Sequence, residues 1–441
     1  MRWILAGLAL AVLLVVPQLP LAENQEQRGV LAVLIVAAIL WFGEVIPLFA
    51  TALLVPVLLG ILTRLPAAEL TQPFFDPIIA LFFGSFVLAI ALSKYGWAQL
   101  AAQAITRLAR GRPRLLLLLL MLAVVLLDAW ISNTATVALL VPMVTAIVQK
   151  NRLRELSPRF AAALYLGLAF ATAIGSMATP VGTPPNALAV RFLAEEGIAL
   201  SFLDWLRVGG PIVLTLLPIT WLLLIWLGGP TKKLLKFAVH PDVSPSPRAW
   251  FVLGILVLTI VLWLSEPLHG LEPGLAALLA AAVLFASRLL QTGDLSRVPF
   301  SVLLLFGGGL VLGDAVRSTG LIDLLANFFA NQFGNMPFVL VLLTIGIGAV
   351  VFTTFASNTA MAAILIPLVI GIAAQTGLPL LPLVLVATFA LSIDFLSPIG
   401  TPPSTIVFQA GKLKIRDFFR FGLPVTLVGL VLVVWFVLIL T

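Results

Sequence analysis

The sequence contains no cysteine, so disulfide bonds and thiolate metal sites are excluded. It contains only two histidines, both in segments that connect apolar stretches, and a metal or haem centre based on histidine is therefore not expected. Charged residues make up 10% of the chain, and the basic ones are scattered over short loops instead of forming one patch. Despite the net charge of +7, this pattern argues against a nucleic-acid partner.

Hydrophobic residues make up 61% of the 441 residues, and the mean hydropathy is +1.18. No soluble domain has this composition, so we predict an all-α polytopic protein that crosses the lipid bilayer of the inner (plasma) membrane many times. It should have about eleven spans and two re-entrant hairpins. The expected spans are 3–22, 30–47, 48–62, 77–92, 160–193, 206–227, 250–264, 273–289, 302–316, 381–408 and 421–440.

The first of these spans is open to two interpretations. Residues 3–22 follow Arg2 and end in Pro20-Leu21-Ala22, which resembles the cleavage region of a signal peptide. The apolar run is, however, longer than the roughly 7–15 residues of a usual signal core. We therefore favour a retained N-terminal spanning helix within residues 1–28.

Two polar triplets interrupt long apolar runs. Ser132-Asn133-Thr134 lies within residues 115–148, and Ser357-Asn358-Thr359 lies within residues 338–373. Each run is too long for one span of about 20 residues and fits a pair of half-length helices. Irregular backbone at membrane depth occurs only where protein or an aqueous cavity covers it. Each triplet is therefore predicted to be a hairpin tip, at 132–134 and at 357–359, that faces a polar site.

The triplets belong to an internal repeat. Gly84 recurs as Gly308, and the segment 179–186 recurs as 397–404. The expected organisation is two repeats, 29–229 and 248–441, joined by a cytoplasmic linker, 230–247.

The two repeats are expected to be inverted relative to each other. Each holds five full spans, an odd number, and a hairpin that returns to its own side of the membrane. Lys and Arg residues gather around the first hairpin and after residues 227 and 408, which places these loops and the N-terminus in the cytoplasm and the C-terminus outside. Inverted repeats with broken helices are a common architecture of secondary transporters.

The paired triplets, together with the Gly-Thr-Pro-Pro segments at 182–185 and 400–403, resemble the divalent anion–sodium symporter family of di- and tricarboxylate or sulfate carriers. The resemblance covers nearly the whole chain. It implies a carrier and not an enzyme, whose substrate is a small dianion, most of all a C4-dicarboxylate such as succinate, malate or fumarate. It also implies Na⁺ as the coupling ion, no organic cofactor, an elevator mechanism and a homodimer.

The same resemblance assigns the site residues. The anion is expected to contact Asn133, Thr134, Thr183, Asn358, Thr359 and Pro402. The first sodium site is expected to use Asp128, Ser132, Asn133 and Gly182, and the second Thr353, Ala356, Asn358 and Gly400.

The chemistry of these residue types supports the assignment. Asn offers an amide donor and a carbonyl acceptor, and Thr offers a hydroxyl. The prolines after Gly182 and Gly400 force the helices to unwind, because proline cannot donate a hydrogen bond within a helix. The helix starts that result carry free N–H groups that suit a carboxylate, and carbonyls at helix ends suit Na⁺.

Asp128 departs from the family, which usually has a small hydroxyl at this place. An acid inside a membrane is a functional candidate by default. Asp128 is consistent with an extra sodium ligand, with a proton carrier, or with a local pair to a hydroxyl or a basic residue. A second acid, Asp394, is left unassigned, and Ser404 stands where the first repeat has the amide of Asn186.

Other functions make different demands. Within the class, the alternatives are a Na⁺-independent or proton-coupled dicarboxylate exchanger and a sulfate or citrate carrier. A membrane-embedded enzyme would need paired acids, a Ser–His or Ser–Lys arrangement or metal ligands inside the spans, and only Asp128 and Asp394 could serve. A channel would not need paired occluded sites.

Asp314 and Arg317, at the end of a span, are expected to form a local ion pair.

Overall fold

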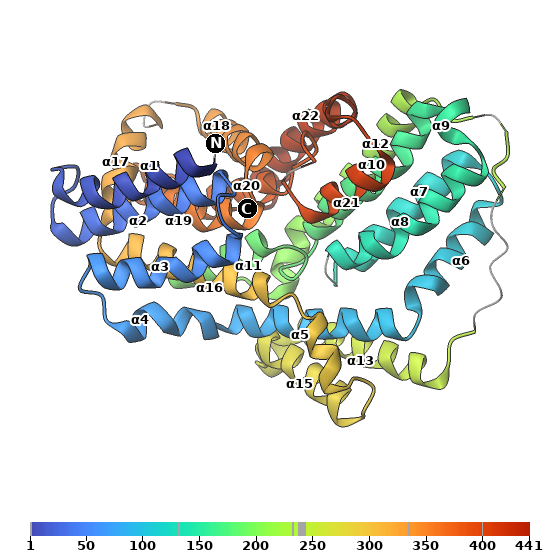
Figure 1. Ribbon diagram of the computed structural model, residues 1–441, viewed down its shortest axis with the longest axis horizontal. Coiled ribbons are helices and arrows are strands. Elements are labelled where there is room, and N and C mark those ends of the chain that lie inside the picture. Colours follow the sequence, from blue (N-terminus) through green and yellow to red (C-terminus); the bar gives the residue numbers. More distant parts are fainter. Residues whose placement is uncertain (1, 131–132, 232, 237–243, 334–335, 399) are drawn as a thin grey trace.

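The computed structural model describes residues 2–130, 133–231, 233–236, 244–333, 336–398 and 400–441. Within these ranges the chain forms helices and no strands. Figure 1 shows the helices packed into one elongated assembly. Nine helices of the described part are long and apolar enough to cross a membrane. The predicted class, an all-α polytopic membrane protein, is confirmed.

The helices follow the predicted order. In the first half they are α1 Arg2–Val15, η1 Val16–Gln18, α2 Gln25–Phe42, α3 Leu48–Leu62, α4 Ala67–Thr71, η2 Gln72–Phe75, α5 Pro77–Lys94, α6 Trp97–Ala109, α7 Pro113–Asp128, α8 Asn133–Lys150, α9 Leu153–Leu156, α10 Pro158–Ser176, α11 Pro184–Glu195 and α12 Phe202–Gly228. In the second half they are α13 Pro247–Leu264, α14 Glu266–His269, α15 Pro273–Ala286, η3 Thr292–Arg297, α16 Phe300–Ser318, α17 Leu321–Phe333, α18 Phe338–Phe355, α19 Asn358–Thr376, α20 Leu380–Leu391, α21 Pro402–Gly411 and α22 Ile415–Leu440.

Both long apolar runs are divided into two helices at the predicted triplets, but the helices have 16 to 19 residues and are longer than the predicted half-length, since α18 and α19 are each long enough to cross a membrane. The first pair is α7 and α8, and the second is α18 and α19. Ser132 of the predicted first tip, 132–134, lies outside the described residues, as does Ile131 before it.

Both predicted helix breaks are present as well. α10 ends at Ser176 and α11 begins at Pro184, while α20 ends at Leu391 and α21 begins at Pro402. The residues before these prolines, Thr183 and Thr401, have extended backbone, as expected for any residue that precedes proline. Proline suits the first position of a helix, because its missing N–H would be unpaired there in any case.

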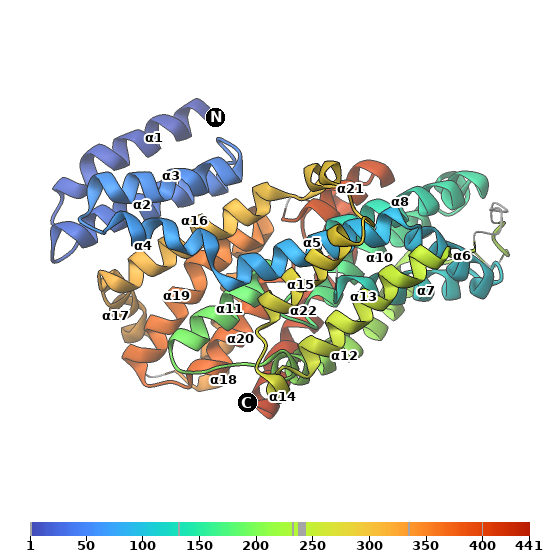
Figure 2. The ribbon, with the colours of Figure 1, turned by 90° about the horizontal axis from the view of Figure 1, so that it is seen from below.

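The first predicted span, 3–22, is longer than the helix that forms. α1 ends at Val15, and the 3₁₀ turn η1 follows with Pro17 in its first turn. Pro17 lacks the N–H that the next helical hydrogen bond would need, and its ring clashes with the preceding turn. α1 packs along α2, as Figure 2 shows, and Trp3 near its start is 90% exposed.

Four helices, α3, α5, α15 and α16, form two tightly packed pairs that we call the frame helices. α5 packs on α15, and α3 packs on α16. A Cβ at Gly84 would lie 2.4 Å from the carbonyl oxygen of Ala277, and a Cβ at Gly308 would lie 2.3 Å from that of Ala52. Glycine is therefore required at both contacts, which explains why Gly84 and Gly308 recur in the sequence.

We use the name hairpin bundle for the two hairpins, the helices around the two breaks and the long helix after each break, which are α7, α8, α10–α12 and α18–α22. Its two halves are interleaved, since α11 packs on α19 and α20, while α21 packs on α8 and α10. α10 is buried along almost its whole length, and residues of both halves share one hydrophobic cluster. The two halves of the predicted site therefore belong to one packed unit.

Candidate functional site

The first helix break, between α10 and α11, is fastened to the first hairpin. The hydroxyl of Thr179 donates to the carbonyl oxygen of Ala129 at 2.6 Å. The Nδ2 amide of Asn186 donates to the carbonyl oxygens of Ser176 and Thr179, both at 2.8 Å. A Cβ at Gly182 would lie 2.2 Å from the Ser176 oxygen, so a side chain does not fit there. Gly182 and Asn186 thus hold the break in one conformation, beside the hairpin that carries Asp128.

The second helix break, between α20 and α21, meets the second hairpin in a similar way. Thr353 Oγ1 lies 3.0 Å from the carbonyl oxygen of Leu391 and also bonds Asn358 Oδ1. A Cβ at Gly400 would lie 2.9 Å from the carbonyl oxygen of Thr353 and 3.4 Å from Asp394 Oδ2. Thr353, Asn358 and Gly400, three of the residues expected at the second sodium site, therefore lie close together.

Each break is also supported by the long helix that follows it. A Cβ at Gly209 of α12 would lie 2.3 Å from the carbonyl oxygen of Met177, and a Cβ at Gly422 of α22 would lie 2.0 Å from that of Phe395. Trp205 of α12 adds a hydrogen bond from Nε1 to the Met177 oxygen at 3.1 Å. In both halves of the chain, a glycine on the following long helix therefore allows the unwound backbone to pack closely against that helix.

The residues expected to contact the anion lie at or beside the starts of α8, α11, α19 and α21. They are Asn133, Thr134, Thr183, Asn358, Thr359 and Pro402. Asn358 and Thr183 are buried, whereas Thr134 and Pro402 are exposed. The first N–H groups of a helix are unpaired and lie at its positive end, so helix starts are suited to an anion.

Several oxygens near the first break and hairpin are buried and accept no hydrogen bond from the described residues. They are both carboxylate oxygens of Asp128, Asn133 Oδ1, Thr172 Oγ1 and Asn186 Oδ1. Asp128 is fully buried, and the hydroxyls of Thr136 and Thr172 lie beside it. Buried oxygens without a partner are costly, and a small hard cation would satisfy them. The donor set therefore fits Na⁺, although the role of Asp128 as a ligand stays a prediction.

Not all predicted sodium ligands can be placed. Ser132 lies outside the described residues. Ala356 is buried at the end of α18, where its carbonyl is free of the helix. The sequence gives no signal for Thr172, whose hydroxyl lies beside Asp128, or for Ser392, whose hydroxyl has no partner among the described residues. A single hydroxyl within a long apolar helix is too weak a signal to identify them.

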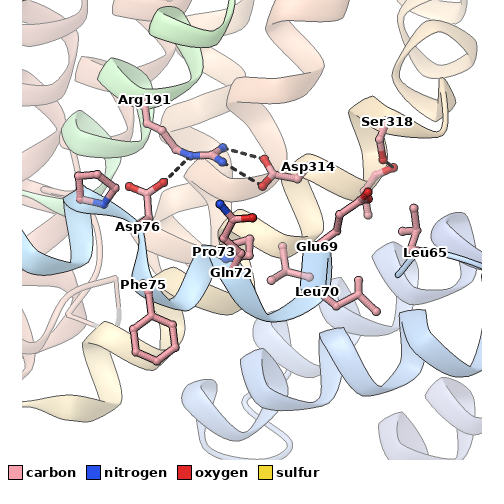
Figure 3. A pocket seen from close by; sticks show the side chains of 13 residues that line it. Leu65, Glu69, Leu70, Gln72, Pro73, Phe75, Asp76, Arg191, Asp314 and Ser318 are labelled. Carbon is pink, nitrogen blue, oxygen red and sulfur yellow. Dashed lines mark hydrogen bonds and ion pairs between the residues drawn. The ribbon is translucent and has the colours of Figure 1, made fainter. Parts of the chain in front are cut away.

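A polar cluster outside the predicted site joins α11 to α5 and α16. Arg191 donates two bonds to Asp314, at 2.7 and 2.9 Å, and one bond to Asp76 at 3.0 Å, as Figure 3 shows. Glu195 also pairs with Arg191, at 2.7 Å. Asp76, Arg191 and Asp314 border a cavity of about 300 Å³ whose other walls come from α4, η2 and α16.

The expected local pair between Asp314 and Arg317 is wrong. Arg317 pairs instead with Glu195 and Glu196, at the end of α11. Asp314 turns toward the guanidinium of Arg191 on α11, and Arg317 turns toward the carboxylates of Glu195 and Glu196 at the end of the same helix. A pair between Asp314 and Arg317 would instead leave Arg191 without Asp314. The sequence could not show this, because α11 is distant from α16 along the chain.

An aromatic stack connects the first hairpin tip to two other helices. Trp130 lies parallel to Phe202 of α12 and to Trp263 of α13, with ring centroids 6.0 and 6.4 Å apart. Trp263 is itself held by a hydrogen bond from Nε1 to the carbonyl oxygen of Pro273 at 3.0 Å. The hairpin tip is therefore in contact with α13, which packs on the frame helix α15.

The chain is similar to known transporters over nearly its whole length. A family model described as citrate transporter (CitMHS) matches residues 32–361 and 333–441. An uncharacterized transporter of Haemophilus influenzae is 33% identical over 426 residues, which cover 93% of this chain and 91% of that protein. The sodium-dependent dicarboxylate transporter SdcS of Staphylococcus aureus (strain USA300) is 30% identical over 447 residues, which cover 93% of this chain and 85% of SdcS.

A solved structure shares the fold. The YdaH transporter of Alcanivorax borkumensis, reported to have an unusual topology, matches with a TM-score of 0.60 at 17% identity, over 84% of this chain and 86% of that one. The predicted divalent-anion carrier family is thus confirmed by the sequence relatives, and so is the prediction that the protein is a transporter and not an enzyme. The chain belongs to the citrate transporter family, among the divalent-anion transporters that also include SdcS.

Proposed function

We propose that this protein is a secondary-active carrier of small divalent anions, most of all C4-dicarboxylates, and that Na⁺ drives their transport. The observation that carries the proposal is the pairing of two hairpins with two proline-opened helix breaks. Thr179 bonds Ala129 in the first pair, and Gly400 abuts Thr353 in the second. The name of the relative SdcS supports the same substrate class and the same coupling ion.

The anion is held by groups that donate hydrogen bonds. The amides of Asn133 and Asn358, each at the start of a hairpin helix, donate to the two carboxylates of the substrate. Hydroxyl donors come from Thr134, Thr183 and Thr359, and the start of α21 at Pro402 adds its positive dipole end. A C4-dicarboxylate carries one carboxylate at each end, which matches a site built from two equivalent halves.

The cations occupy the sites that flank the anion. The first uses Asp128, Ser132, Asn133 and Gly182, and the second uses Thr353, Ala356, Asn358 and Gly400. Na⁺ prefers oxygen ligands, and buried oxygens of Asp128 and Asn133 have no partner among the described residues. A cation beside each hairpin tip also lowers the cost of placing a dianion in a buried site, because opposite charges attract strongly where water is excluded.

The hairpin bundle moves as one body against the frame helices, as in an elevator. Two features support this division: the hairpin bundle shares one hydrophobic cluster between its halves, and the frame helices contact each other through glycines. Gly84 and Gly308 occupy equivalent places, as do Gly209 and Gly422, which supports two inverted repeats within 29–229 and 248–441. We also propose a cytoplasmic N-terminus and an external C-terminus, an orientation that is inferred from the loops rich in Lys and Arg. The proposed homodimer is inferred from the family resemblance.

Uptake of radiolabelled succinate into proteoliposomes tests this function. The conditions are an inward Na⁺ gradient, an inward H⁺ gradient, and internal succinate without either gradient. We expect the Na⁺ gradient to accelerate uptake and the other two to have little effect. Sulfate and citrate, added as competitors, define the anion class. Absence of succinate uptake in all three conditions would reject the dicarboxylate assignment.

A second candidate function is an exchanger of dicarboxylates that is independent of Na⁺ or coupled to protons. The observation that favours it is Asp128, an acid at a place where the family usually has a hydroxyl, with no basic residue of the described chain within ion-pair distance. The same assay separates the two functions. Uptake that requires internal succinate identifies an exchanger, and uptake driven by H⁺ alone identifies proton coupling.

A further inference from the structure

The two halves of the chain each place one acid and one hydroxyl at equivalent positions, but in exchanged order. Asp128 in the first half corresponds to Thr353 in the second, at the spacing of the two triplets, 225 positions (353 − 128). Ser176 corresponds to Asp394, at the spacing of the two Gly-Thr-Pro-Pro segments, 218 positions (394 − 176). The acid lies at the end of the hairpin arm α7 in the first half and just after the broken helix α20 in the second.

The structure places Asp394 beside the residues expected at the second sodium site. The carboxylate faces Gly400, because a Cβ at Gly400 would lie 3.4 Å from both Asp394 Cβ and Oδ2. The same Cβ would lie 2.9 Å from the carbonyl oxygen of Thr353. The hydroxyl of Thr401 also lies beside the carboxylate. Asp394 and Thr353 therefore approach one point from the break and from the hairpin.

Asp394 is a buried carboxylate with an oxygen that is unpaired among the described residues. It is 3% exposed, and its Oδ2 accepts no hydrogen bond from the described residues. Ser392 Oγ, two residues earlier, is buried and also without a partner there. Among the described residues no basic side chain lies within 4.0 Å of the Asp394 carboxylate. A buried carboxylate without an ion pair is costly, and a bound cation would offset that cost.

We propose that Asp394 is a cation ligand of the second site, so that each half of the carrier supplies one carboxylate from an opposite element. The first cation takes the carboxylate of Asp128 from the hairpin, and the second takes that of Asp394 from the helix break. The inference rests on the proposed Na⁺-coupled function, and it adds a ligand residue that the resemblance does not supply. Thr353 supplies the hydroxyl beside the second cation, whereas the hydroxyls beside Asp128 are those of Thr136 and Thr172.

The consequence is that both cation sites depend on a negative charge. Affinity for a hard cation rises with the number of charged oxygen ligands. Removing either carboxylate should therefore weaken Na⁺ binding at its own site and leave the other site intact. Moving the carboxylate within the second site, from the break to the hairpin, should preserve binding, because position 353 is the equivalent of position 128.

Na⁺-dependent thermal stabilisation of the purified full-length protein tests this proposal without any substrate. Na⁺ is titrated against K⁺ at constant ionic strength, since a ligand that binds only the folded protein raises its melting temperature. The variants are Asp394→Asn, Asp128→Asn, the double variant, and Asp323→Asn as a control at an exposed acid of α17. We expect each single variant to lose the stabilisation from its own site at Na⁺ concentrations that saturate the wild type and to regain it only at roughly tenfold higher Na⁺, while the other site responds as in the wild type. The double variant should lack both contributions at those concentrations.

A rescue variant covers the case in which Asp394→Asn does not fold. Asp394→Ser combined with Thr353→Asp places the second half in the arrangement of the first and should respond to Na⁺ like the wild type. Asp394→Asn with a wild-type Na⁺ response, or a wild-type protein that Na⁺ and K⁺ stabilise equally, would overturn the proposal. Succinate uptake by the wild type is measured separately, so a protein that binds Na⁺ through both acids but transports no succinate would reject only the proposed substrate.

Discussion

Arg191 of α11 and Asp314 of α16 form a two-bond ion pair, with distances of 2.7 and 2.9 Å between guanidinium nitrogens and carboxylate oxygens. α11 follows the first helix break, and α16 is a frame helix. The ion pair therefore links the hairpin bundle, which carries the candidate site, to the frame helices. Asp76, at the start of α5, accepts a third bond from the same arginine at 3.0 Å.

Arg191→Gln should destabilise the protein because it leaves Asp76 and Asp314 without their shared partner. We expect a loss of about 1–3 kcal/mol, between the values for exposed and fully buried pairs. Arg207→Gln is the matched control, since Arg207 pairs with Asp204 on an exposed surface of α12 and should change stability by less than about 1 kcal/mol. Melting temperatures in detergent compare the two. Equal effects would show that the Arg191 cluster contributes no more than a surface pair.

Gly182→Ala should disrupt the first helix break. The added Cβ would lie 2.2 Å from the carbonyl oxygen of Ser176, and the backbone has no room to yield because Asn186 also bonds that oxygen. We expect a loss of about 1–3 kcal/mol in stability together with loss of transport. Gly254→Ala on α13 is the control, because its Cβ would meet no atom within 4 Å and alanine favours the helix. A Gly182→Ala protein with normal stability would contradict the described packing of the break.

Asn133→Ala and Asn358→Ala should each abolish succinate uptake, since each removes one amide donor for a substrate carboxylate. The loss should be at least about tenfold, the equivalent of one hydrogen bond to a charged group. Thr344→Ala is the control on the second hairpin, because this residue is exposed and its hydroxyl donates to the carbonyl oxygen of Leu340 in its own helix. Initial uptake rates in proteoliposomes give the comparison, with melting temperatures to confirm folding. Wild-type rates in both asparagine variants would exclude the triplets from the anion site.

Stability at acid pH should depend on the contact between Lys94, at the end of α5, and Asp294 of η3. The backbone amide of Gln291 and the Lys94 ammonium, 2.7 Å away, hold the pKa of Asp294 below its ordinary value. An acid whose pKa is lowered on folding stabilises the protein above the unfolded pKa of about 3.9, and that contribution disappears as the pH falls through the folded value.

Asp294→Asn should therefore lower the melting temperature at pH 7, and the difference from wild type should shrink below about pH 4. Glu155→Gln, in a pair with Arg152 whose side chains are both more than half exposed, is the control and should differ little at either pH. A difference between Asp294→Asn and wild type that stays constant down to pH 3 would mean that the Asp294 charge is not responsible.

Much of the fold could be predicted from the sequence because its determinants are local. The prolines at 184 and 402 end the unwound segments regardless of tertiary contacts, and the triplets interrupt runs too long for one span. The second break begins at Ser392, five residues before the repeated segment 397–404, because no proline marks where α20 ends. The helix α1 is shorter than the predicted span 3–22, because hydropathy does not reflect the local effect of Pro17 on the backbone.

The parts that could not be predicted depend on contacts between distant segments. Arg191 and Asp314 are far apart in the sequence, and only the packing of α11 beside α16 makes them partners. The surroundings of Asp394 depend likewise on how the second break folds back on the hairpin at Thr353 and Gly400. A sequence can indicate that an acid lies within the membrane, but its neighbours have to come from the structure.

The central claim is that the hairpin starts at Asn133 and Asn358 together form the anion site. A cryo-electron microscopy map of the protein in lipid nanodiscs with Na⁺ and succinate tests it most directly, with a map in K⁺ without succinate for comparison. We predict extra density for a four-carbon dianion between these two amides, flanked by cation density near Asp128 and near Thr353. Succinate density elsewhere, with the region between Asn133 and Asn358 unchanged, would contradict the account.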